Sequence, residues 1–276
     1  MLRKPLSFIV ACVLVLGMAA CGKKEEAGPA KESVPQKPAV TPGEMVLIPA
    51  GEFILGSNDK DTPASSPERK VNLPAFWIDK YEVTNSEFLD FSIKTGYAGE
   101  GVKEGKDWRA FITPEKARHP VVYITWNDAA EYCKSLGKRI PTEEEWEKAA
   151  RGTDGRRYPW GNQWDPTKSN TYESGLRNTA EIGKFDDVSP YGVHDMLGNV
   201  QEWTGSWYEP YKGSTHKDEN FGKRFRVVRG ASTYIYGSRS HLWDRSAWLP
   251  NYLSGFGCRC AKDATPEEAA KGGAAK

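Results

Sequence analysis

The sequence lacks the local motifs that mark common catalytic centres. Its four histidines are widely spaced, and they form no HxH or HExxH pair that would predict a preformed zinc or iron site. A G-x-S-x-G nucleophile elbow and a glycine-rich phosphate loop are also absent, which argues against a serine hydrolase and a nucleotide-binding enzyme. We therefore interpret the histidines as scattered structural or surface residues: His119, His194, His216 and His241.

An excess of charge of either sign is missing as well. Lys and Arg total 38 against 37 Asp and Glu, so no nucleic-acid or acidic polymer partner is expected. What the 276 residues do contain is 10 tryptophans, 27 glycines and 18 prolines. This composition is typical of a loop-rich fold whose irregular segments are held by aromatic packing.

The N-terminus has the layout of a targeting segment. Arg3 and Lys4 precede an apolar run over residues 6–16, which is shorter than the roughly 20 residues of a membrane-spanning helix. The sequence "MAAC" resembles the lipobox of bacterial lipoproteins, and this implies removal of a signal peptide over residues 1–20 and lipidation, including palmitate, of Cys21. Gly22 resembles the residue that permits sorting to the outer membrane, so we expect a membrane-anchored lipoprotein that faces the periplasm. An ordinary secreted protein with an incidental cysteine is the alternative.

Composition then divides the rest of the chain. Residues 21–43 contain no aromatic residue and several prolines, so they are predicted to be a flexible tether. Residues 44–263 are the predicted folded domain, and residues 264–276 a disordered tail or frayed helix.

Within that domain, residues 45–57 are expected to form a hairpin or strand pair, and residues 71–84 a strand. Capping boxes at Thr84, Thr125 and Thr142 predict three helix starts. Helices early in the domain and irregular sheet later, without a βαβ alternation, predict an α+β fold.

The cysteines predict one disulfide. Three remain besides Cys21 after the signal peptide: Cys133, Cys258 and Cys260. In an oxidising compartment one pair is expected, and because Cys258 and Cys260 are poorly placed to bridge each other, a long-range bridge to Cys133 is sterically more plausible. The leftover thiol is expected to be buried and inert, with reactivity as the alternative.

Several motifs occur together in one order: "IPAGEFILGS", "IDKYEVTNSEF", "HPVVYITWNDAAEYCKSLGKRIPTEEEWEKAARG", "YPWGNQW", "DMLGNVQEWTGSWY", "VVRGAS" and "GFGCRCAKD". Over residues 44–263 the chain thereby resembles the formylglycine-generating enzyme (sulfatase-modifying factor) family. The resemblance implies a single α+β domain, a C-type-lectin-like variant with little regular secondary structure. It also implies a disulfide between Cys133 and Cys260, and leaves Cys258 as an extra thiol for which a redox role is the lesser alternative.

The family oxidises a sulfatase cysteine to Cα-formylglycine with O2 and with copper held by two cysteines. The matching segment here, "RGASTYIYGSRSH", places Ile235 and Ser240 at those two positions and retains the family's serine as Ser232. Because soft Cu(I) requires sulfur ligands, copper binding is not expected.

The turn "DMLGNVQEW" resembles a calcium site of the family. The resemblance implies carbonyl ligands and one carboxylate from Asp195, Gly198, Val200 and Glu202. The alternative is that Glu202 caps or salt-bridges a packed loop. A second calcium site would include Asn170 and Thr171. It is expected to be weaker, because the position of its carboxylate ligand is Ser174 or has shifted to Glu173.

Two function hypotheses follow. Gln201 stands where the family commonly has a tryptophan, and together with the missing cysteines this favours a binding or scaffolding module with a peptide, protein or glycan ligand. The alternative is a divergent oxidoreductase that forms formylglycine or carries out a related metal-dependent oxidation. The aromatic segment 234–248 would line a ligand surface or pack in the core.

Overall fold

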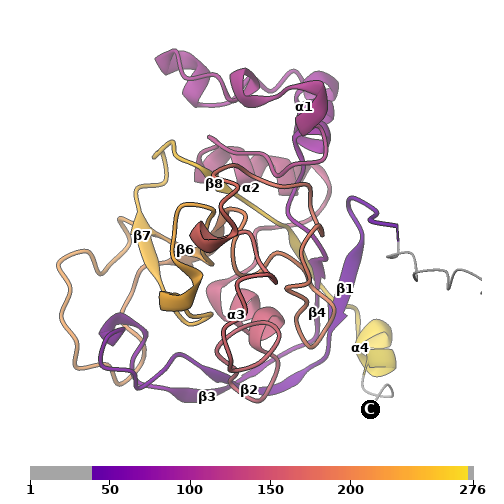
Figure 1. Ribbon diagram of the computed structural model, residues 1–276. Helices are drawn as coiled ribbons and strands as arrows, with labels where there is room; N and C mark the ends of the chain where they lie inside the picture. Colours follow the sequence, from indigo (N-terminus) through magenta and orange to yellow (C-terminus); the bar gives the residue numbers. More distant parts are fainter. Residues whose placement is uncertain (1–38, 273–276) are drawn as a thin grey trace, which may run out of the picture. The chain divides into compact units, whose positions relative to one another are not determined.

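The computed structural model describes residues 39–272, and three small β-sheets organise them (Figure 1). The first sheet has the antiparallel order β1-β4-β9 and the second pairs β2 with β3. The third has the order β7-β6-β5-β8, in which β5 and β8 run parallel. The strands are β1 (Met45–Ile48), β2 (Gly51–Leu55), β3 (Arg69–Leu73), β4 (Phe76–Asp79), β5 (Gln201–Trp207), β6 (Arg226–Arg229), β7 (Ser246–Trp248), β8 (Phe256–Gly257) and β9 (Ala261–Asp263).

The α-helices of the described chain are short, and the first three begin where the capping residues predicted. They are α1 (Asn85–Thr95), α2 (Trp126–Ser135), α3 (Glu143–Arg151) and α4 (Pro266–Gly272). Thr84, Thr125 and Thr142 each accept a hydrogen bond from the backbone N–H three residues on, and the acidic residue there bonds back, so all three capping boxes are confirmed. Six short 3₁₀ segments complete the described elements: Pro63–Ser65, Gly101–Glu104, Trp108–Phe111, Pro114–Lys116, Tyr172–Ser174 and Gly237–Arg239.

The hairpin expected over residues 45–57 is wrong. Its two apolar runs are strands, but β1 pairs with β4 and β2 pairs with β3. The chain leaves one sheet and enters another between them, where the Lys148 ammonium donates to the carbonyls of Pro49 and Gly51 at 2.7 and 2.9 Å. Lys148 of α3 therefore binds the chain where it passes from one sheet to the other, and no local sequence pattern contains this long-range contact.

Helix α2 carries the predicted disulfide cysteine into the core. Ala129 and Cys133 are fully buried in a cluster with Trp108, Tyr132 and Trp203. The fold is thus α+β with modest regular secondary structure, as the sequence predicted, and its core is rich in aromatic rings.

The tail forms α4 over residues 266–272, in agreement with the helical alternative for this segment. Within residues 39–272, no helix combines the length and the apolar composition needed to span a bilayer. The signal segment, Cys21 and the tether up to residue 38 lie outside the described residues.

Candidate functional site

A cavity of about 550 Å³ opens beside the first residues of β5. Its walls come from segments far apart in the sequence: the start of α1, residues 120–123, the turn at 199–201, residues 232–235 and residues 248–256. Among residues 39–272, Lys116 is the one Lys, Arg, Asp or Glu that lines it, and most of the other polar side chains there are neutral amides and hydroxyls. Protein cavities that bind small-molecule ligands are commonly of this size.

The cavity contains one of the two positions that the family resemblance assigns to copper ligands. Ile235 lines it together with Ser232 and Gln201. Ser240 is not among the wall residues; its side chain is buried, and its hydroxyl donates to the carbonyl of Tyr236 at 2.8 Å. Position 235 therefore provides a hydrocarbon side chain in the wall, and position 240 provides a hydroxyl that is already hydrogen-bonded.

Exposed aromatic rings stand at the cavity. Phe111 and Tyr123 stack at 3.8 Å between ring centroids and are 38% and 37% exposed. Tyr123 has a φ of +60°, which non-glycine residues seldom adopt, and donates its N–H to the carbonyl of Ser254. Tyr234 is 69% exposed, whereas Trp243 of the same segment is buried. The segment 234–248 thus contributes some rings to the exposed cavity wall and others to the core.

Several wall residues carry no sequence signal. Asn85 occupies the first turn of α1, and Lys116 and Thr179 belong to irregular segments. His119 lies behind the wall and shares a hydrogen bond of 2.9 Å with the Thr179 hydroxyl. Burial lowers the pKa of His119, which keeps the ring neutral near pH 7.

The Glu202 carboxylate of the turn at 195–202 is engaged by other protein groups. Arg259 donates to both of its oxygens at 2.7 Å, and the Trp146 indole N–H donates at 3.0 Å. All three side chains are fully buried. The turn itself requires Gly198, because a Cβ there would lie 2.9 Å from the carbonyl oxygen of Asn170.

The residues present therefore do not fit a calcium ion at Glu202 while Arg259 occupies the carboxylate. The Asp195 side chain likewise accepts the N–H of Gly183 at 2.7 Å. Within residues 39–272, no three His, Cys, Asp or Glu side chains are grouped so as to hold a metal ion. Glu202 is therefore salt-bridged within a packed loop, which was the alternative to calcium binding. Calcium binding at this turn stays a prediction.

The weaker second calcium site is also internally bonded. The Asn170 side chain bonds to neighbouring loops, and Thr171 donates its hydroxyl to Glu173 at 2.8 Å. The Glu173 carboxylate accepts the backbone N–H groups of Gly237 and Ser238 at 2.9 Å each. Although burial opposes them, hydrogen bonds from Ser238 and Gly237 lower the pKa of Glu173 to about 2. These bonds link the Tyr172–Ser174 segment to the Gly237–Arg239 segment.

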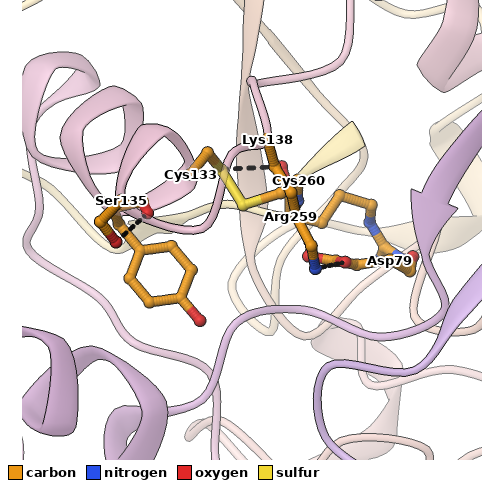
Figure 2. The surroundings of a disulfide bond; sticks show 7 residues. Asp79, Cys133, Ser135, Lys138, Arg259 and Cys260 are labelled. Atoms are coloured by element: carbon orange, nitrogen blue, oxygen red, sulfur yellow. Dashed lines mark hydrogen bonds and ion pairs between the residues drawn. A yellow bond between two sulfur atoms is a disulfide. The ribbon is translucent and has the colours of Figure 1, made fainter. Parts of the chain in front are cut away.

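The disulfide between Cys133 and Cys260 is confirmed (Figure 2). It joins residues 127 apart with a Cα separation of 5.6 Å. Cys258 is free and fully buried in the same core cluster. Burial, followed by the nearby carboxylate of Glu202, raises the pKa of Cys258 well above its usual range, so it is a neutral thiol.

Known proteins resemble this chain over nearly its whole length. The description "Sulfatase-modifying factor enzyme 1-like domain" matches residues 30–264. The formylglycine-generating enzyme of Bos taurus is 31% identical over 309 residues, which cover 90% of this chain and 82% of that protein. The inactive C-alpha-formylglycine-generating enzyme 2 of Mus musculus is 32% identical over 274 residues, 80% of this chain and 86% of that protein. The solved structure of PvdO from Pseudomonas aeruginosa has a TM-score of 0.64 and 25% identity, and covers 82% of this chain and 100% of that one.

Proposed function

The chain belongs to the sulfatase-modifying factor enzyme 1-like family, and from this we propose that its domain is a binding module that uses the cavity beside Ser232 without copper-thiolate chemistry. One observation carries the proposal: Ile235 lines that cavity at a position where the family resemblance calls for a cysteine. A hydrocarbon side chain offers no donor to Cu(I).

The family by itself does not decide between binding and catalysis, because relatives described as active and as inactive are similarly related to this chain. The remaining thiols of the described domain support the binding proposal. Cys133 and Cys260 are joined to each other, and Cys258 is buried with a raised pKa. None of them supplies an accessible thiolate at the cavity.

The proposal is tested by incubating the purified protein with Cu(I), O2 and a cysteine peptide of the sulfatase motif. We expect no conversion of the peptide cysteine to formylglycine in mass spectra, while a formylglycine-generating enzyme converts it under the same conditions. Formation of the aldehyde product would instead establish the alternative, a divergent oxidoreductase of the same family.

We propose that calcium does not bind at residues 195–202 while Arg259 neutralises Glu202 in the buried turn. Addition of a calcium chelator is expected to leave Tm unchanged within about 1 °C, since a ligand that is not bound to the folded state shifts no equilibrium. Thermal unfolding with and without millimolar calcium measures this. A rise of several degrees with calcium would show that the cation binds and that Arg259 gives way.

The proposed setting follows from the N-terminal segment. We propose that lipidated Cys21 anchors the protein to a membrane, and that the domain faces the periplasm, with the outer membrane as the expected location. The tether over residues 21–43 would then give the cavity access to ligands near that surface.

A further inference from the structure

Five side chains from two segments form a continuous surface beside the cavity. The guanidinium carbon of Arg177 lies 3.2 Å from the centroid of the Tyr172 ring, and that ring lies 4.2 Å from the ring of Tyr236. The guanidinium carbon of Arg239 lies 5.4 Å from the centroid of the Tyr236 ring. The Tyr234 hydroxyl donates to the carbonyl of Arg177 at 3.0 Å, and Tyr234 also lines the cavity. We call these five residues the tyrosine–arginine surface.

This surface is accessible to a partner molecule. Tyr234 is 69% exposed and Tyr236 is 44% exposed, and the side chains of Arg177 and Arg239 are exposed as well. Tyrosine rings provide a large contact area with few rotatable bonds, and tyrosine and arginine carry much of the binding free energy at protein interfaces. The composition of the surface therefore favours a protein partner.

The two segments that carry the surface are fixed to each other. The Glu173 carboxylate of one segment accepts the backbone N–H groups of Gly237 and Ser238 of the other, at 2.9 Å each. Gly237 also packs so closely that a Cβ there would lie 2.1 Å from a ring carbon of Trp164. A surface that is already held in position loses less conformational entropy on binding than a mobile one.

The two arginines of the surface lack acidic partners. Within the described residues, neither Arg177 nor Arg239 forms an ion pair with a carboxylate. The charge of Glu173, whose two oxygens accept backbone N–H groups, offsets only one of the two arginines. Because a guanidinium group pairs with a carboxylate through two parallel hydrogen bonds, the surface is complementary to acidic side chains.

An acidic protein segment fits this surface better than a polyanion does. Proteins that bind DNA neutralise many phosphates, on the order of 6–10 in well-studied cases. The tyrosine–arginine surface has two arginines, and the whole chain has a formal net charge of only +1. Two guanidinium groups beside packed tyrosine rings suit a short segment that carries a few carboxylates and an apolar side chain.

We propose that the tyrosine–arginine surface docks an acidic segment of a partner protein. Carboxylates of the partner pair with Arg177 and Arg239, and an apolar side chain of the partner packs on the rings of Tyr172 and Tyr236. The inference goes beyond the proposed function, because it concerns protein docking beside the cavity and holds whether the cavity binds or catalyses.

The test begins with the selection of phage-displayed random dodecapeptides on the full-length protein. We expect the enriched peptides to be acidic, and their affinity, measured by titration of synthetic copies, to fall as the salt concentration rises. Arg239→Glu is expected to weaken binding at least about tenfold, because attraction becomes repulsion, while Tm stays within about 2 °C of the wild-type value. Arg224→Glu reverses an exposed arginine outside this surface, and as the matched control it leaves affinity within about twofold.

A second pair of variants tests the tyrosine rings. Tyr236→Ala is expected to weaken binding about fivefold, and Tyr236→Phe to leave it within about twofold, because the ring supplies the contact. Enrichment of no peptide, enrichment without an acidic bias, or acidic peptides that bind Arg239→Glu as tightly as the wild type would overturn the inference. Binding of dextran sulfate without that of any acidic peptide would overturn it in favour of a polyanion. Formylglycine formation would overturn the proposed function and leave this inference standing.

Discussion

Replacing Arg259 by methionine is expected to lower the free energy of unfolding by about 3–5 kcal/mol, the largest loss we predict for a single substitution. The guanidinium pairs with both oxygens of Glu202 and also donates to the carbonyls of Asp79, Lys80 and His194. Methionine fills similar volume but leaves Glu202 as an uncompensated buried charge. Chemical denaturation of the purified protein measures the loss as a lower midpoint at constant slope.

Arg259 also affects buried carboxylates other than Glu202. Burial raises the pKa of Glu82 well above its usual range, and the charges of Asp195 and Glu202 raise it further. Arg259 is the cation that opposes this raised pKa. Removing it therefore acts on a group of buried carboxylates and not on one pair alone.

Two controls separate the buried charge from other effects. Arg139→Met removes an arginine that also pairs with a carboxylate, Glu145, but at a side chain 38% exposed, so a loss of about 1 kcal/mol or less is expected. The double variant Glu202→Gln with Arg259→Met is expected to recover part of the loss, because the unpaired charge is gone. A single Arg259→Met variant as stable as Arg139→Met would contradict the assigned role.

Removal of the disulfide by Cys133→Ala with Cys260→Ala is the second large effect. The bond closes a loop of 127 residues between α2 and the short segment that joins β8 to β9. In the chain-entropy account, opening it costs about 4–5 kcal/mol through the greater freedom of the unfolded chain. We expect Tm to fall by about 10 °C or more, as measured by calorimetry.

Cys258→Ala is the matched control for that experiment. Cys258 is as buried as Cys133 and Cys260 and belongs to the same cluster, but it is not cross-linked. Its substitution removes one sulfur contact, so a loss of about 1–2 kcal/mol is expected. If the control and the double variant lost equal stability, packing and not the cross-link would be the source.

The cysteine pattern shows how far the sequence reached into the site. Spacing disfavoured a bridge between Cys258 and Cys260 and favoured a bond from one of them to Cys133. The family resemblance implied Cys260, which the structure confirms. The sequence also showed that positions 235 and 240 are Ile and Ser and not cysteine. The identity of a side chain decides whether it can bind copper. In contrast, the sequence left two alternatives for Glu202, a calcium ion or a salt bridge in a packed loop, and did not identify Arg259 as its partner.

The sequence by itself determined three helix starts, the fold class and the absence of a thiol at residues 235 and 240. These depend on a few neighbouring residues, such as the hydrogen bonds between Thr142 and Glu145 three positions on, or on the chemistry of one side chain. Tertiary structure alone decided that β1 and β2 enter different sheets, that Arg259 neutralises Glu202, and that Asn85, Tyr123 and Ile235 line one cavity. Each of these depends on contacts between residues far apart in the chain, and such contacts arise from packing that no local pattern encodes.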